Sequence, residues 1–198
     1  MKKKGFQEPD KYTSFEELIK SEKNNKDYKI CFQQKDSEIL FLAPHGGVIE
    51  PGTSEIAKAL AGDQFSYYTF ESLKKPGNID LHITSSHFNE PQALEMASKS
   101  KVVVTVHGYG WDENGECIMV GGLDNDLAKK IKIKFKKVGY EVKSSVKMFN
   151  GTSPRNICNH GRSKQGIQLE INLILRKNLI KNKDKMKVFV DAVHLALE

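Results

Sequence analysis

The sequence predicts a single-domain α/β fold, in which a mixed, mostly parallel β-sheet carries helices on both faces. The chain has 198 residues, close to the usual size of one domain. Segments typical of strands alternate with segments typical of helices along its whole length. Residues 101–106 are almost continuously apolar, as expected of a strand buried on both faces of a parallel sheet. We therefore expect residues 1–198 to form one domain, with residues 1–13 as a loose N-terminal arm.

The elements expected in the first half of the chain follow from capping residues and from apolar patterns. Ser14 and Glu17 form a capping box that begins a short helix. Pro51 suits the first turn of a second helix, which ends before Gly62. β-branched and aromatic runs, or regular alternation, indicate the strands. The expected helices are 14–22, 51–60 and 89–98, and the expected strands are 28–33, 38–43, 65–70 and 79–84.

In the second half of the chain, apolar residues at helical spacing predict a basic helix over 124–137 and an amphipathic helix over 185–197. The remaining expected strands are 101–106, 116–120, 140–146 and 166–173. Residues 147–165 have no clear periodicity and are rich in Gly, Asn, Ser and Pro. Loops of this length are uncommon in compact domains and usually have a function.

The composition favours an anionic partner. The formal net charge is +6, and only three of the 31 basic residues are arginine. Lysine is a strongly hydrated point charge, whereas arginine recognises carboxylates and phosphates with two parallel hydrogen bonds. The lysine runs have no interleaved aromatic residues, which argues against a specific nucleic-acid surface.

The sequence also indicates a compartment. It contains no run of 18 apolar residues, which argues against a membrane partner, and its basic N-terminus has no apolar signal-peptide core. The three widely spaced cysteines do not form a disulfide or zinc-knuckle pattern. We expect synthesis in the cytoplasm without a signal peptide, and a monomer.

Two expected strands each end in a His-Gly pair. His45 and His107 follow the strands 38–43 and 101–106, and Glu50 lies five residues after His45, just before a helix. Ligands gather beyond the carboxyl ends of parallel strands. Two imidazoles, one carboxylate and an open position are the ligands of catalytic zinc in several hydrolases. The alternative is a turn histidine and a glutamate stabilised by a helix N-terminus.

Glu170 lies in the expected strand 166–173, on the polar face that also carries Gln168 and Asn172. A carboxylate fixed on a strand beside a metal could act as a general base. A solvated strand face is the alternative.

The loop of residues 150–163 contains two of the three arginines, Arg155 and Arg162, together with Asn156. This clustering favours recognition of an anion over a plain surface loop. Among the other histidines, His194 has a structural interpretation. His82 and His87 lie at the carboxyl end of an expected strand and could border a site, but their spacing gives neither a ligand role.

Five sequence blocks, taken together and in order, resemble the phage-type poly-γ-glutamate hydrolase family: PHGGVIEPGT (44–53), LHITSSHFNEP (81–91), VVVTVHGYG (102–110), SPRNICNHGR (153–162) and GIQLEI (166–171). The resemblance implies a zinc-carboxypeptidase-like α/β fold that cleaves the γ-glutamyl amide bonds of an anionic capsule polymer. It also implies one Zn²⁺ per chain and, for a phage-derived protein, action outside the cell after host lysis.

The same resemblance implies roles for individual residues. The zinc ligands would be His45, Glu50 and His107, and the catalytic carboxylate would be Glu170. Carboxypeptidases proper space the first histidine and the glutamate three residues apart, whereas the spacing here is five. The substrate contacts would be Arg155, Asn156 and Arg162.

Two other functions remain open on the sequence alone. One is a zinc amidase that acts on small acidic acyl-amino acids or on peptidoglycan stem peptides, with the same four metal and catalytic residues. The other is a basic nucleic-acid-binding protein with a structural metal.

Overall fold

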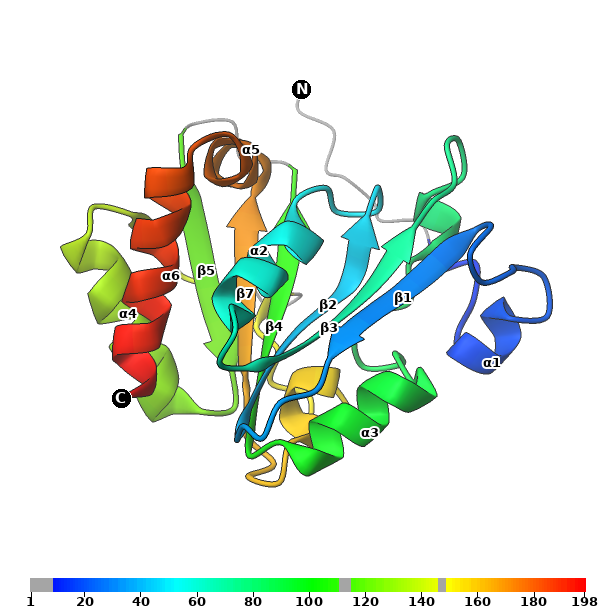
Figure 1. The fold of residues 1–198 in the computed structure, drawn as a ribbon, viewed down its shortest axis with the longest axis horizontal. Coiled ribbons are helices and arrows are strands. Elements are labelled where there is room, and N and C mark those ends of the chain that lie inside the picture. Colours follow the sequence, from blue (N-terminus) through cyan, green and yellow to red (C-terminus); the bar gives the residue numbers. More distant parts are fainter. Residues whose placement is uncertain (1–8, 111–114, 146–148) are drawn as a thin grey trace.

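A seven-stranded sheet in the order β1-β3-β2-β4-β7-β5-β6 runs through the protein (Figure 1). The computed structural model describes residues 9–110, 115–145 and 149–198. The strands are β1 (Tyr28–Gln33), β2 (Ile39–Gly47), β3 (Ser66–Ser72), β4 (Val102–Tyr109), β5 (Cys117–Gly122), β6 (Glu141–Lys143) and β7 (Ile167–Asn172).

Most strand pairs in the sheet are parallel. Strands β3, β2, β4 and β7 run in the same direction, and β6 runs parallel to β5. The antiparallel pairs are β1 with β3 and β5 with β7. The expected mixed, mostly parallel sheet is confirmed.

Helices cover both faces of the sheet, as the alternation of elements predicts (Figure 1). One core contains Phe41 and Val104 from the strands and packs under α2, α4, α5 and α6, while the other contains Leu42 and Val103 and packs under α1 and α3. The helices are α1 (Phe15–Leu18), α2 (Thr53–Ala61), α3 (Pro91–Lys99), α4 (Asn125–Lys137), α5 (Leu173–Lys181) and α6 (Lys183–Leu197). In the described part of the chain, no helix has the length and apolar character that a membrane span requires.

The structure differs from the expected elements in several places, and the helix expected over 14–22 is only Phe15–Leu18. Residues 79–84 form no strand: a 3-10 helix covers Ile79–Leu81, and the chain is then irregular up to α3. The strand expected over 140–146 is only Glu141–Lys143, and residue 146 lies outside the described residues. The helix α5 was not predicted, because strand alternation continues through Leu173 although the Asn172 side chain already caps a helix there.

The expected loose arm is also different where it is described. Residues 1–8 lie outside the described residues, but the following ones are packed. Tyr12 is buried in the second core and donates a hydrogen bond to Glu22 Oε1 at 2.7 Å. Two residues earlier, Asp10 contacts His82 and Thr84. This segment is therefore fixed against the body of the protein.

Candidate active site

The side chains of His45, Glu50 and His107 converge beyond the carboxyl ends of β2 and β4. His45 Nδ1 lies 3.1 Å from Glu50 Oε1 and 3.2 Å from His107 Nδ1. His107 Nδ1 is 3.8 Å from the other carboxylate oxygen of Glu50. Both histidines are buried. The two His-Gly strand ends thus meet the downstream glutamate, as the topology of parallel strands predicts.

The backbone explains how β2 brings His45 into this group. Phe41 and Ala43 face the core under α2, and simple alternation would send residue 45 to the same side. The register between β2 and β3 shifts between Ala43 and Gly46. A shift of this kind redirects a side chain at a strand end. It lets His45 meet His107, which lies on the opposite face of the sheet from Val104.

The outer ring nitrogens of the two histidines are held by one short segment. His45 Nε2 is 2.8 Å from the carbonyl oxygen of Ile83, which can only accept, so this nitrogen carries a hydrogen. His107 Nε2 is 3.3 Å from Ser85 Oγ. Both rings therefore present Nδ1 to the cluster, and outer-shell bonds of this type orient metal-binding histidines.

The protonation states of Glu50 and His107 suit a divalent cation, whereas His45 favours its protonated form: burial lowers the pKa of His45, but the adjacent Glu50 raises it above its usual value. Burial alone would raise the pKa of Glu50, but the His45 and His107 imidazoles lower it to about 2. Burial lowers the pKa of His107 to about 3, with help from His45 and His82 and against the attraction of Glu50. Glu50 is therefore ionised and His107 neutral at pH 7, and these are the forms that bind metal ions.

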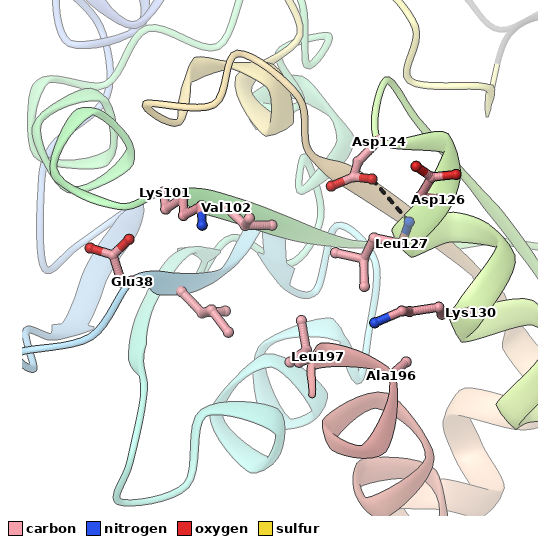
Figure 2. Close-up of a pocket in the computed structure, with 10 residues that line it drawn as sticks. Glu38, Lys101, Val102, Asp124, Asp126, Leu127, Lys130, Ala196 and Leu197 are labelled. Carbon is pink, nitrogen blue, oxygen red and sulfur yellow. Dashed lines mark hydrogen bonds between the residues drawn. The ribbon is translucent and has the colours of Figure 1, made fainter.

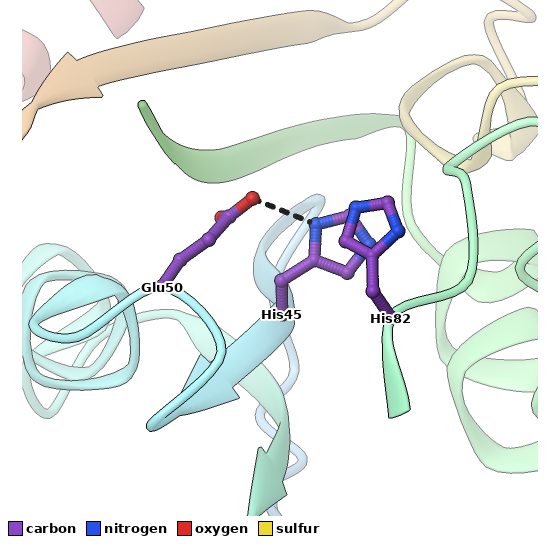
Figure 3. Close-up of side chains that lie close together, drawn as sticks. All are labelled: His45, Glu50 and His82. Carbon is purple, nitrogen blue, oxygen red and sulfur yellow. Dashed lines mark hydrogen bonds and ion pairs between the residues drawn. The ribbon is translucent and has the colours of Figure 1, made fainter. Parts of the chain in front are cut away.

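A third imidazole lies against the first (Figure 3). The ring of His82 packs on that of His45 with 4.0 Å between centroids. Ligand atoms of His45, Glu50 and His82 all lie within 4.8 Å of one another. This donor set of imidazole nitrogens and one carboxylate fits zinc, with His107 or His82 completing the trio.

The turn that carries Glu50 is tied to the end of β4. The backbone N–H of Gly108 donates to Glu50 Oε2 at 2.8 Å. The buried guanidinium of Arg176 donates to the carbonyl of Pro51 at 2.9 Å and to that of Tyr109 at 3.3 Å. A Cβ atom at position 108 would overlap this guanidinium, so glycine allows Arg176 to lie flat against the strand. Arg176 thereby bridges the two backbone segments that carry Glu50 and His107.

Glu170 lies on β7 beside His107, with which it is paired in the parallel β4–β7 ladder. Its side chain is buried and accepts a hydrogen bond from Gln168 Nε2 at 2.8 Å. Gln168 Oε1 in turn accepts from Asn156 Nδ2 at 2.8 Å. Burial and the nearby Glu50 raise the pKa of Glu170 well above its usual value, against the effects of Gln168 and Arg176. The strand face is therefore an ordered polar network beside the cluster of His45, Glu50 and His107, and not a solvated surface.

The family model for poly-gamma-glutamate hydrolase matches residues 12–190 of this chain. The chain belongs to the poly-gamma-glutamate hydrolase family. A solved bacteriophage poly-gamma-glutamate hydrolase is similar in structure, with a TM-score of 0.88 and 31% identity over 95% of this chain and 96% of that one. Zinc-free, apo YndL superposes with a TM-score of 0.87 and 36% identity, covering 96% of this chain and 98% of that chain.

Curated relatives of this poly-gamma-glutamate hydrolase family member come from Bacillus subtilis strain 168. The SPbeta prophage-derived UPF0714 protein YoqZ is 38% identical over 193 residues, which is 93% of this chain and 69% of the relative. The UPF0714 protein YndL is 40% identical over 172 residues, which is 86% of this chain and 67% of the relative. The expected family and fold are confirmed.

Two of the expected substrate contacts in this hydrolase-family chain have other partners in the structure. Asn156 is buried, and its side-chain atoms bond to Gln168 and to the backbone of Cys158, so it supports the network that holds Glu170. Arg162 bonds to Glu38 and to the Lys99 carbonyl. Glu38 directly precedes β2, so it lies at the opposite end of this strand from His45. Arg162 therefore lies away from the cluster of His45, Glu50 and His107, where the resemblance implies a carboxylate contact.

A separate pocket lies at this end of the strands, beside the starts of β2 and β4 (Figure 2). Its lining mixes acidic and basic side chains, including Glu38, Lys101 and Asp124. Arg155, in contrast, is exposed next to Asn156, on the side of the Glu170 network. The substrate contact expected of Arg155 stays a prediction.

Three residues of the site were not assigned from the sequence. The sequence places His82 near a possible site without giving it a role, and it places Asp10 in the N-terminal arm. It gives no role to Arg176. One signal was available for Arg176: a lone arginine follows the apolar run Leu173–Leu175, where a buried helix face begins.

Proposed function

We propose that this protein is a zinc-dependent hydrolase that cleaves the γ-glutamyl amide bonds of poly-γ-glutamate. One observation carries the proposal: the Nδ1 atoms of His45 and His107 and the carboxylate of Glu50 converge beside the buried Glu170, in a chain of this family. The name of the related bacteriophage hydrolase and the zinc-free form of YndL support the substrate and the metal.

The proposed ligands are His45, Glu50 and His107, with one zinc ion per chain. When bound, zinc supplies Lewis acidity toward the scissile carbonyl and the attacking water. The chain supplies the geometry: Ile83 and Ser85 hold the outer nitrogens of the histidines, and Gly108 holds one oxygen of Glu50. Ligands held in this way need little rearrangement on binding.

Glu170 is the proposed general base. It takes a proton from the attacking water and returns it to the nitrogen of the leaving amine, so one carboxylate serves both steps. Burial raises the pKa of its carboxyl, which helps it retain the proton between the two steps. The bond from Gln168 Nε2 fixes one oxygen and leaves the other for the proton transfer.

We propose that Arg155 binds a free carboxylate of the polymer. Poly-γ-glutamate carries one such group on each residue, and a guanidinium can hold it with two charge-assisted hydrogen bonds. The net charge of +6 favours the approach of a polyanion, and salt weakens this attraction. As a hydrolase with prophage-derived relatives, the protein would act on capsule polymer outside the cell after lysis.

Digestion of purified poly-γ-glutamate tests the proposal. We expect the polymer to shorten on a gel, the chelator-treated protein to be inactive, and added zinc to restore cleavage. A peptidoglycan stem peptide and an acidic acyl-amino acid are incubated in parallel. Cleavage of either small substrate with an intact polymer would refute the proposed substrate while keeping the zinc amidase chemistry. Activity that survives complete zinc removal would refute the metal mechanism.

A further inference from the structure

The N-terminal segment reaches the outer shell of the candidate metal site through one side chain. Asp10 Oδ1 lies 2.6 Å from His82 Nδ1, and Asp10 Oδ2 accepts the backbone N–H of Thr84 at 2.6 Å. Both carboxylate oxygens are therefore engaged, and the side chain is mostly buried. Tyr12, two residues later, is buried in the core and bonds to Glu22, so it anchors the chain next to Asp10.

The segment that Asp10 holds is the same one that orients both metal-binding histidines. Within residues 82–85, the ring of His82 packs on His45, the carbonyl of Ile83 accepts from His45 Nε2, and Ser85 Oγ contacts His107 Nε2. These three contacts come from three neighbouring positions of an irregular stretch that has no strand ladder of its own. Backbone hydrogen bonds hold it at His82, whose N–H donates to Ile79, and at Ser85, whose carbonyl accepts from Ile157. Side-chain bonds hold the backbone between these two points.

Asp10 makes two side-chain bonds to this stretch, one to the backbone of Thr84 and one to the ring of His82. The N–H of Thr84 lies between the Ile83 carbonyl and Ser85, so a bond there fixes the backbone that presents both groups. The bond to His82 Nδ1 fixes the plane of the ring that lies against His45. The family model matches from residue 12 onward, so Asp10 lies just outside the matched stretch.

We propose that Asp10 is a positioning residue of the zinc site, which acts by clamping residues 82–85 against the outer nitrogens of His45 and His107. This inference rests on the metal site of the proposed function and extends its supporting shell to the N-terminal segment. Loss of an outer-shell partner typically weakens metal binding by about 10- to 100-fold. Asp10 supports two ligands at once through one segment.

The competing explanation is that Asp10 simply attaches the N-terminal segment to the protein. Lys11 provides a control, because it also joins the N-terminal segment to the part of the chain near residue 82, through the 3-10 helix Ile79–Leu81. Its Nζ lies 3.0 Å from Asp80 Oδ2, in the adjacent 3-10 helix, and touches none of residues 82–85 in the bonds described. A purely structural role predicts similar effects of removing either side chain.

Zinc affinity, measured by competition with a chromophoric chelator, separates the two explanations. The proteins are the wild type, Asp10→Ala, Asp10→Asn and Lys11→Ala, and thermal unfolding of each zinc-free protein is followed by circular dichroism. We expect Asp10→Ala to bind zinc about 10- to 100-fold more weakly than the wild type while remaining folded. Asp10→Asn should lose less, because its amide oxygen can still accept from Thr84. Lys11→Ala should match the wild type.

Activity at limiting and saturating zinc provides a second readout. The cleavage rate of Asp10→Ala should recover when zinc is in excess, because the ligands and Glu170 are intact. Wild-type zinc affinity in folded Asp10→Ala would overturn the inference, and so would equal losses in Asp10→Ala and Lys11→Ala. If Asp10→Ala does not fold, wild-type affinity in Asp10→Asn would overturn it. A wild-type protein that binds no zinc would instead refute the metal site itself.

Discussion

His107 and Glu170 are direct partners in the ladder between β4 and β7. In a parallel pair, side chains at partnered positions point to the same face of the sheet. A proposed zinc ligand and the proposed general base are thus aligned by backbone hydrogen bonds, and not by a loop. Rigid placement of this kind suits proton transfer, which requires hydrogen-bond distances.

This pairing gives the first prediction. Glu170→Gln should keep the fold and the zinc, because Glu170 is not among the proposed ligands, but should lose about 10²-fold or more in kcat, the scale of a positioned acid–base group. Elemental analysis and polymer cleavage measure the two properties. Glu90→Gln is the control, since Glu90 is a buried carboxylate that caps α3. Near-normal turnover of zinc-loaded Glu170→Gln would exclude Glu170 as the base.

The second prediction concerns the metal ligands. The purified wild type should contain about one zinc per chain, and His45→Ala and His107→Ala should each lose it, because removing one of three protein ligands leaves too few to hold the ion. His160→Ala, on the 3-10 helix Ile157–His160, should retain zinc. Full zinc content in His107→Ala, with loss in His82→Ala, would show that His82 is the third ligand.

The third prediction separates the two loop arginines. Arg155→Lys should lower kcat/KM on poly-γ-glutamate by about 10-fold or more, because lysine cannot form the two-pronged contact. Arg162→Lys should cleave normally, since Arg162 bonds to Glu38 at the far edge of the sheet. Initial rates measured at low and high salt distinguish a specific contact from general attraction. A larger loss in Arg162→Lys than in Arg155→Lys would mean that the substrate is recognised near Glu38, at the start of β2.

The fourth prediction tests the close approach of Arg176 to β4. Gly108→Ala should destabilise the protein by about 1–3 kcal/mol, the usual cost of overpacking, because the new methyl group overlaps the buried guanidinium. Gly110→Ala is a control two residues away, where a Cβ atom meets nothing within 4 Å among the residues that the structure describes. Urea unfolding of both variants gives the comparison. Equal stabilities would mean that Arg176 can move aside without cost.

The fifth prediction is a loss of stability in alkali. Burial raises the pKa of the Cys158 thiol from 9.0 to about 12. Above pH 9 the unfolded chain loses this proton while the folded chain keeps it, so the free energy of unfolding falls as the pH rises from 9 toward 12. Burial also raises the pKa of Tyr140 to about 12, which acts in the same direction above pH 10.

Urea unfolding at pH 8 and pH 10.5 measures this effect. Cys158→Ala should lose less free energy of unfolding between the two pH values than the wild type does, whatever its stability at pH 8. The same pH dependence in both proteins would show that the thiol ionises without unfolding.

The sequence predicted that His45, Glu50 and His107 lie together better than it predicted their surroundings, and the reason is topological. Carboxyl ends of parallel strands share one edge, so the His-Gly pairs at 45 and 107 had to be neighbours once their strands were. Strand order is a long-range property, and no local pattern shows that β7 lies beside β4. The position of Glu170 next to His107 therefore needed the family resemblance or the structure.

For the candidate site, the structure departs from the expectations in segments without periodicity. The loop of residues 150–163 contacts Gln168 through Asn156, yet by Arg162 it has reached Glu38 and the start of β2. Residues that cluster in the sequence of this loop therefore do not all lie near one site in the structure. Asp10 lies 72 residues before His82 in a segment with no strand or helix pattern, so nothing local signals their contact.

The place of β7 in the sheet also bears on how the protein is made. Ribosomes complete β7 after all the other strands, yet it lies between β4 and β5 in the sheet. A nascent chain that stops before residue 167 cannot join β5 and β6 to the rest, and strand pairs so distant in sequence form slowly. Glu170 arrives with the strand that closes the gap. We expect a growing chain to be inert until β7 has been made, so that catalysis begins with the last step of sheet assembly.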